Sequence, residues 1–147
     1  MTQITDRKTW LGLLARAPQG RIASLLSQVG PVPPATDLRR PEVGSVMVQG
    51  RAGGTGSAFN LGEMTVTRCS LQLPCGTVGH GYVQGRSKAD ARAAAVVDAL
   101  LQTDYTNRVH AAVTGPLAAE AAARQKSRAA KAAATRVEFF TLVRGED

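Results

Sequence analysis

The sequence predicts an α+β fold, with an antiparallel meander of three to four strands between N-terminal, central and alanine-rich C-terminal helices. Two observations carry this prediction. Apolar residues recur at helical spacing before residue 30 and again after residue 87, whereas the segment between them alternates with a period of two. The length of 147 residues suits one domain, 1–147. A strand-like tail is expected after the last helix.

Two short helices are expected at the N-terminus. Residues 5–17 place one broad apolar stripe on a helix, formed by Trp10, Leu11, Leu13, Leu14 and Ala17. Residues 21–29 repeat the pattern with Ile22, Leu25, Leu26 and Val29. Pro18 and Gly20 separate the two, and the segment GPVPP at 30–34 predicts a connector to the strands.

Three strands are expected next, at Ser45–Arg51, Met64–Leu73 and Thr77–Gln84, with a short extra strand near Thr36–Arg40. The glycine-rich segment RAGGTGSAFNLGE would join the first two of the three strands. Pro74-Cys75-Gly76 predicts a tight hairpin turn between the second and the third.

A central helix is expected from Ser87 to about Gln102, with Ala93, Val96, Val97 and Leu100 buried. Ser87 and Asp90 fit a capping box, in which the hydroxyl accepts from the third backbone N–H and the carboxylate reaches back. Residues 103–115 predict an irregular connection in which Val109, Ala112 and Val113 are partly buried.

The last predicted helix, 116–134, begins at a proline and is dominated by alanine. Its polar face is formed by Glu120, Arg124, Ser127, Arg128 and Lys131. Such a helix either lies solvated on its own domain or docks on another subunit. The tail at 136–144 is apolar on both faces of a strand and therefore needs cover. The candidate docking residues are Val137, Phe139, Phe140, Val143 and Arg144.

The formal net charge of +7 favours anionic partners, since 14 of the 18 basic residues are arginine. No apolar run reaches the length of about 18 residues that a membrane span needs, and MTQITDRKTW lacks the apolar core of a signal peptide. We therefore expect a cytoplasmic protein without a membrane partner.

Metal and nucleophile chemistry find little support in the pattern. Cys69, Cys75, His80 and His110 form no metal-binding spacing, so no metal site is expected. Neither histidine has an obvious nucleophile partner. His80 is a structural or exposed residue on one interpretation, and a general base in a partner's site on the other.

The glycine loop is the most suggestive local feature for anion binding. Gly53, Gly54 and Gly56 allow backbone N–H groups to converge on an anion, while Arg51 and Thr55 would add side-chain donors. The segment lacks GK[ST], so it is no Walker A loop, and glycine-rich turns are often purely structural. A standalone enzyme that uses this loop as its phosphate cradle is one alternative.

A second alternative is a double-stranded-RNA-binding module. The order helix, three strands, helix, with Lys88 and Arg92 at the start of the second helix, resembles that module. Asp90 at the same helix start would repel phosphate, and the module leaves the C-terminal 45 or so residues unexplained. Nucleic acid is therefore the weaker partner hypothesis.

Three segments together resemble the PhnG family, the small subunit of the bacterial carbon–phosphorus lyase core complex. They are RAGGTG at 51–56, GRSKADARAAAVVDALLQ at 85–102 and RVEFFTLVRGED at 136–147; Trp10 and the TxTR pattern at 65–68 extend the similarity. The resemblance implies phosphonate breakdown together with PhnH, PhnI and PhnJ and a functional link to PhnL. It implies a complex that converts MgATP and an alkylphosphonate to α-D-ribose 1-alkylphosphonate 5-triphosphate and adenine. The radical step, with an iron–sulfur cluster and S-adenosylmethionine, would belong to PhnJ.

The residues and the resemblance together predict an accessory or assembly subunit that binds no cofactor itself. With no cluster-binding cysteines, the chain cannot hold the radical step. Its cations could still contact triphosphate or phosphonate groups. The candidates are Arg51, Arg68, Arg86 and Lys88, beside the loop residues already named. Solvated surface positions or inter-subunit ion pairs are the alternative roles of these side chains.

Overall fold

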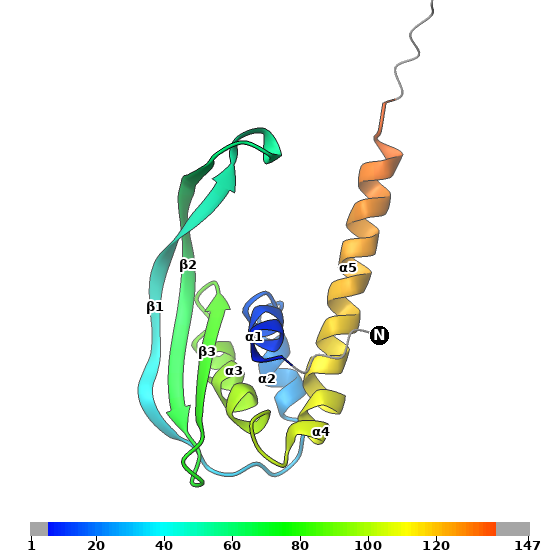
Figure 1. The fold of residues 1–147 in the computed structure, drawn as a ribbon. Coiled ribbons are helices and arrows are strands. Elements are labelled where there is room, and N and C mark those ends of the chain that lie inside the picture. Colours follow the sequence, from blue (N-terminus) through cyan, green and yellow to red (C-terminus); the bar gives the residue numbers. More distant parts are fainter. Residues whose placement is uncertain (1–5, 138–147) are drawn as a thin grey trace, which may run out of the picture.

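The computed structural model describes residues 6–137 and has the expected α+β architecture. A three-stranded antiparallel sheet, in the order β1-β2-β3, is covered on one face by helices (Figure 1). The elements are α1 (Arg7–Ala15), α2 (Arg21–Leu26), β1 (Thr36–Arg51), the 3₁₀ turn η1 (Ala52–Gly54), β2 (Ala58–Gln72), β3 (Val78–Gln84), α3 (Lys88–Leu100), α4 (Thr106–Val109), the π-helical turn η2 (His110–Thr114) and α5 (Gly115–Ala134).

The first two strands are longer than the sequence pattern predicts. The two segments expected near 36–40 and 45–51 form the single strand β1, and β2 begins at Ala58 rather than at Met64. Pro41 masks the continuity, because proline is normally incompatible with a ladder. Here it lies in an edge strand, where the register shifts across it, between Arg39 and Glu42, and the missing N–H is tolerated.

The hairpin of β1 and β2 extends well beyond the rest of the sheet. The last residue of β3, Gln84, pairs with Val66, whereas β1 and β2 stay paired out to Arg51 and Ala58. Residues 45–65 therefore form a two-stranded ribbon, which curls at its tip towards the helical side of the molecule (Figure 1). At a rise of about 3.3 Å per residue, the ribbon is about 20 Å long.

Helix α3 packs closely on β3 because two glycines leave room for its backbone. A Cβ atom on Gly81 would overlap the carbonyl oxygen of Ala91, and one on Gly79 would overlap that of Ala95. The expected buried residues Ala93, Val96, Val97 and Leu100 all lie in the core. The helix thus uses alanines to approach the sheet and larger side chains to fill the flanks.

The N-terminal helices complete the core much as their stripes predict. Trp10 and Leu14 of α1 are buried, and Leu11, Leu13 and Ala17 pack partly buried against the core. Ile22, Leu25 and Val29 are also buried. The second helix ends at Leu26, and its predicted last turn, 27–29, is a hydrogen-bonded turn that still points Val29 inward.

Residues 103–105 form a turn but the chain is helical from Thr106, so the prediction of an irregular connection is wrong for residues 106–115. Helix α4, the π-turn η2 and α5 follow one another without a break from Thr106. Pro116 explains the π-turn, because a proline has no N–H and its ring crowds the carbonyl four residues before it. The N–H of Gly115 accordingly donates to the carbonyl of His110, five residues back. Val109 and Val113 are buried and Ala112 partly so, as expected.

Helix α5 leaves the core after about two turns. Leu117 is buried and Glu120 binds Arg21 of α2, but every residue from 122 to 137 is exposed. The helix therefore extends beyond the other helices, on the opposite side of the molecule from the β1–β2 ribbon (Figure 1). The sequence leaves two expectations for this helix, that it lies solvated on its own domain or that it docks on another subunit. Only the initial turns lie on the domain itself.

Candidate anion-contacting and docking surfaces

The glycine loop forms the tip of the β1–β2 ribbon. Gly53 and Gly54 both adopt positive φ angles, +60° and +83°, which glycine tolerates best. The N–H groups of Thr55 and Gly56 donate to the carbonyl of Ala52, the latter at 2.8 Å. The glycines thus supply the predicted backbone freedom, but two of the loop amides serve a closed turn rather than an open cradle.

The guanidinium of Arg51 also takes part in closing this turn. Its Nη1 donates to the carbonyl of Gly56 at 3.3 Å, and the side chain is exposed. A bond of this length on the surface contributes little, so an anion could replace the carbonyl as partner at small cost. Arg51 therefore remains available for an anion.

Arg68 is held by a carboxylate of its own chain. It lies opposite Glu42 in the β1–β2 register, and its Nε donates to Glu42 Oε1 at 2.7 Å. Arg39 reaches the same oxygen at 3.4 Å. The three side chains are about half exposed, and their net charge is only one positive. Of the predicted cations, Arg68 is thus the least suited to an external anion.

Arg86 lies in the turn between β3 and α3, and Lys88 is the first residue of α3. Both are exposed, and neither forms an ion pair within residues 6–137. Ser87 between them caps α3 by accepting the N–H of Asp90 at 3.1 Å, as predicted. The structure therefore distributes the predicted cations over three places, which are the ribbon tip, the uncovered sheet face and the β3–α3 turn.

The second half of the predicted capping box is wrong. Instead of reaching back to its own helix start, the buried carboxylate of Asp90 accepts the N–H groups of Gly20 and Ala23, at 2.6 and 3.4 Å. It thereby caps α2, which has no capping side chain of its own. Arg92, the other cation of the RNA-binding hypothesis, is occupied as well, since its Nε donates to Asp37 at 3.1 Å.

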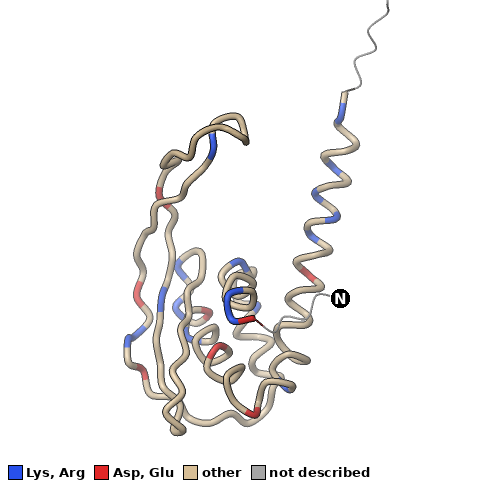
Figure 2. Tube along the Cα trace, viewed as in Figure 1, with Lys and Arg blue, Asp and Glu red and all other residues tan. Residues whose placement is uncertain are grey.

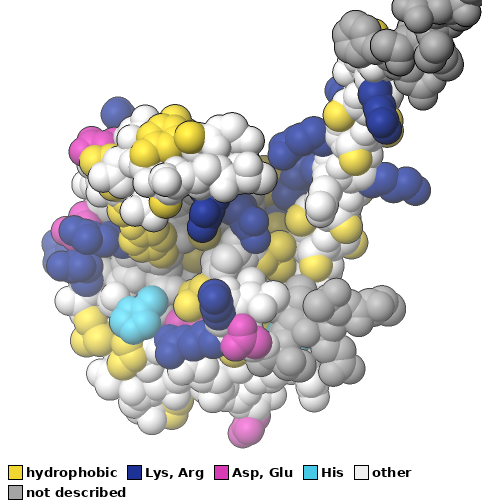
Figure 3. Space-filling view, turned by 45° about the horizontal axis from the view of Figure 1, so that its top comes forward, with side chains coloured by type: hydrophobic (Ala, Val, Ile, Leu, Met, Phe, Trp, Pro, Cys, Tyr) yellow, Lys and Arg dark blue, Asp and Glu magenta, His cyan; other side chains and the backbone are white. Residues whose placement is uncertain are grey.

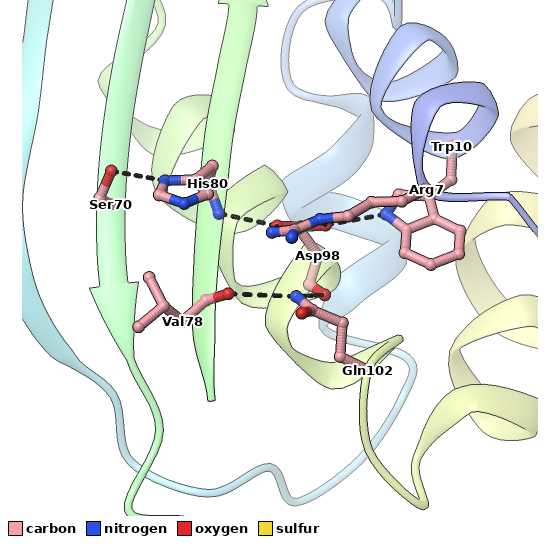
Figure 4. Close-up of polar contacts among 7 residues, drawn as sticks. All are labelled: Arg7, Trp10, Ser70, Val78, His80, Asp98 and Gln102. Carbon is pink, nitrogen blue, oxygen red and sulfur yellow. Dashed lines mark hydrogen bonds and ion pairs between the residues drawn. The ribbon is translucent and has the colours of Figure 1, made fainter. Parts of the chain in front are cut away.

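A polar cluster around Asp98, which the sequence pattern does not reveal, fastens α1 to α3 and β3 (Figure 4). The Asp98 carboxylate is fully buried and accepts four hydrogen bonds. The donors are Arg7 Nε at 3.1 Å, Arg7 Nη2 at 2.7 Å, Trp10 Nε1 at 2.9 Å and the His80 backbone N–H at 2.8 Å. The hydrogen bond to Asp98 raises the pKa of the Arg7 guanidinium, against the opposing effect of burial, so the guanidinium stays protonated.

His80 and Ser70 do not form a catalytic triad with Asp98. The Ser70 hydroxyl lies 2.9 Å from His80 Nδ1 on the exposed face of the sheet. Asp98 binds the backbone of His80 and not its ring, so the carboxylate cannot orient the imidazole (Figure 4). Within the described part of the chain, no group of three histidine, cysteine or acidic side chains is placed to hold a metal ion.

Two projecting elements are candidates for docking. The ribbon exposes Met47, Phe59 and Leu61, with 54%, 45% and 67% of their surfaces accessible. Helix α5 exposes its whole outer half. Of the predicted docking residues in the tail, Val137 is 68% exposed, while Phe139, Phe140, Val143 and Arg144 lie outside the described residues. None of the helices within residues 6–137 combines the length and the apolarity that crossing a membrane requires.

Comparison with known proteins gives a consistent answer. The family described as "Phosphonate metabolism protein PhnG" matches residues 5–145. A protein of Rhizobium meliloti (strain 1021), named alpha-D-ribose 1-methylphosphonate 5-triphosphate synthase subunit PhnG, is 43% identical over 144 residues. That alignment covers 98% of this chain and 92% of the relative. Both similarities span the ribbon, the core and α5, and the chain therefore belongs to the PhnG family of phosphonate metabolism proteins.

Proposed function

We propose that this chain is the PhnG subunit of an α-D-ribose 1-methylphosphonate 5-triphosphate synthase and serves there as an accessory, assembly-promoting subunit. The observation that carries the proposal is the 43% identity, over 98% of the chain, to a relative that bears this name. The exposed ribbon and the exposed outer half of α5 support the assembly role, because a subunit needs surfaces that its own core does not cover.

The family resemblance supplies the partners and the reaction of this proposal. The chain would assemble in the cytoplasm with PhnH, PhnI and PhnJ and act together with PhnL. The complex would exchange the adenine of MgATP for an alkylphosphonate. This chain would bind no cofactor, and the iron–sulfur cluster and S-adenosylmethionine of the later radical step would belong to PhnJ.

We further propose that Arg86 and Lys88 are the cations of this chain that face the anionic substrate or a charged partner, with Arg51 and the glycine loop in a secondary role. Arg86 and Lys88 are exposed and free of ion pairs within residues 6–137, whereas Arg68 is paired with Glu42. Free cations bind phosphate groups without first losing an internal partner.

The assembly role is tested by co-expressing the tagged chain with the other subunits from the same organism, followed by size-exclusion chromatography. Co-elution in one large species is expected, and elution as a lone 15.4 kDa protein would refute the proposal. A chain that ends at Thr135 should no longer co-elute, because it lacks Phe139 and Phe140. Burial of these two side chains against the partner would contribute on the order of 3–6 kcal/mol to assembly. Assembly of the truncated chain at wild-type yield would rule out tail docking.

The substrate role needs a kinetic readout on the assembled complex. Arg86→Gln combined with Lys88→Gln should raise the KM for MgATP or for the phosphonate while the complex still assembles. Lys8→Gln is the matched control, because Lys8 is an exposed cation of α1 without an ion pair in the described residues. If the double variant and the control show the same KM, these two cations do not serve the substrate.

A further inference from the structure

The outer half of α5 carries one sign of charge. After Glu120, the chain has no acidic residue up to Val137 but five basic ones, namely Arg124, Lys126, Arg128, Lys131 and Arg136. Figure 2 shows this as a run of blue positions above a single red one, and in Figure 3 the dark-blue side chains stand out from the helix. The exposed cations are concentrated on the part of the helix that leaves the core.

Within residues 6–137, the chain provides almost no counter-charge for these cations. Glu120 is the one acidic residue of α5 (Gly115–Ala134), and its Oε1 already accepts from Arg21 at 2.6 Å. Its other oxygen lies 3.9 Å from Arg124, at the limit of an ion pair. The remaining four cations form no ion pair with any residue between 6 and 137. A partner that brings carboxylates would therefore meet unpaired cations.

Three of the cations share one face of the helix. Arg124, Arg128 and Lys131 follow one another at spacings of four and three, which places them on one side. Alanines occupy much of the rest of the surface, so a partner can approach the helix backbone closely beside the cations. Alanine also has the highest helix propensity, which favours the helical form of this segment before any partner binds.

We propose that α5, from Ala122 to Ala134, is a docking helix that lies in a carboxylate-lined groove of another protein subunit of the complex. This inference rests on the function proposed above. The 13 residues span about 20 Å, and a groove that encloses most of a helix of this length buries several hundred Å², a large share of the roughly 800 Å² per partner in a stable interface. The alanines favour a protein over a nucleic acid, because close apolar packing is not rewarded by a phosphate backbone.

The experiment measures binding of the tagged chain to the complex assembled from the other subunits, at 50 mM and at 500 mM NaCl. The test variant carries Arg124→Gln, Arg128→Gln and Lys131→Gln, which remove three charges and keep helix propensity. The control variant carries Lys8→Gln, Arg16→Gln and Arg40→Gln, three exposed cations that form no ion pair in the described residues. Both variants have the same net charge, so a general charge effect changes them equally.

We expect the test variant to lose affinity by about 10- to 100-fold at low salt and the control by less than about 3-fold, with the difference shrinking at high salt because ions screen the contacts. Arg128→Glu alone should weaken binding more than Arg128→Gln. Equal binding by the test and control variants overturns the docking helix and leaves the subunit function intact. Failure of the wild-type chain to bind at either salt concentration overturns both. If the test variant assembles normally but loses binding to duplex RNA, the helix serves nucleic acid and the inference is wrong.

Discussion

Replacing Asp98 by asparagine tests whether the buried carboxylate holds the N-terminal helix on the core. Asparagine keeps the shape of the side chain but offers one oxygen instead of two. One carboxylate oxygen accepts from Arg7 Nε and Trp10 Nε1, and the other accepts from Arg7 Nη2 and the His80 N–H. Whichever way the amide turns, its NH₂ group therefore faces two donors, one of which belongs to Trp10 or His80.

The expected loss of stability follows from these contacts. An unsatisfied buried donor costs about 1–3 kcal/mol. The ion pair with Arg7, whose side chain is 42% exposed and therefore partly screened, adds about 1 kcal/mol. Asp98→Asn should thus lower the free energy of unfolding by about 2–4 kcal/mol, a large part of the 5–15 kcal/mol typical of a domain.

Urea titration of the purified chain measures this loss directly. Trp10 is the only tryptophan and donates to Asp98, so its fluorescence reports the cluster itself, and circular dichroism at 222 nm gives an independent signal. Asp104→Asn is the matched control, because Asp104 is exposed and forms no ion pair in the described residues; it should change stability by less than about 0.5 kcal/mol. A loss below about 1 kcal/mol for Asp98→Asn, at an unchanged urea slope, would refute the assigned role of the cluster.

Three further predictions follow from the packing and the pKa values. Gly81→Ala should prevent α3 from packing closely on β3 and should lower the midpoint of thermal unfolding. The control Gly62→Ala, where a Cβ would meet open space, should leave this midpoint nearly unchanged. Equal midpoints for the two variants would contradict the close approach of α3 to β3. The pKa of the exposed Cys75 thiol is lowered by its hydrogen bond with a neighbouring threonine, whereas burial raises the pKa of the Cys69 thiol. Brief iodoacetamide treatment followed by mass spectrometry should therefore find Cys75 alkylated before Cys69, and the reverse order would count against the structure. The hydrogen bond from its arginine partner on α2 lowers the pKa of Glu120, so the ionised carboxylate stabilises the fold above its ordinary pKa of 4.5 and loses this contribution as the pH falls through the lower pKa of the folded state. The stability difference between the wild type and Glu120→Gln should therefore shrink between pH 5.5 and pH 3. A difference that stays constant over this range would contradict the ion pair.

The sequence predicts best where burial is one-sided and the contacts are local. The central helix and its buried face were predictable because Ala93, Val96, Val97 and Leu100 repeat at helical spacing and α3 packs on the sheet with that face. The length of β1 was not predictable, because Pro41 interrupts the sequence pattern of a strand although a proline is tolerated at the edge of a sheet. The π-turn escapes the sequence pattern for a similar reason, because Pro116 predicts a helix start whereas the chain is already helical before it.

The candidate sites show the same limit. Residue type alone marks Arg68 and Arg92 as candidate cations, but both meet carboxylates of β1, 26 and 55 residues away in the chain. Asp98 looks like an ordinary polar position of a helix, and its partner Arg7 lies 91 residues before it. Such pairings depend on how the elements are placed in space, which no local pattern records. Arg86 and Lys88 are exposed and form no ion pair within residues 6–137, and their contact with an anion stays a prediction.

The π-turn before Pro116 has a consequence for the direction in which α5 presents its side chains. A helix advances by about 100° per residue, so the one additional residue of a π-turn rotates everything that follows by about that angle. Val109 on one side of the turn and Leu117 on the other are both buried and fix the two helix segments against the core. The rotational phase of Arg124, Arg128 and Lys131 is therefore fixed by the number of residues between those two anchors. A single deletion within His110–Thr114 would turn α5 by about a quarter of a circle, moving Leu117 out of its buried position together with the cationic face, whereas many substitutions there would leave both in place.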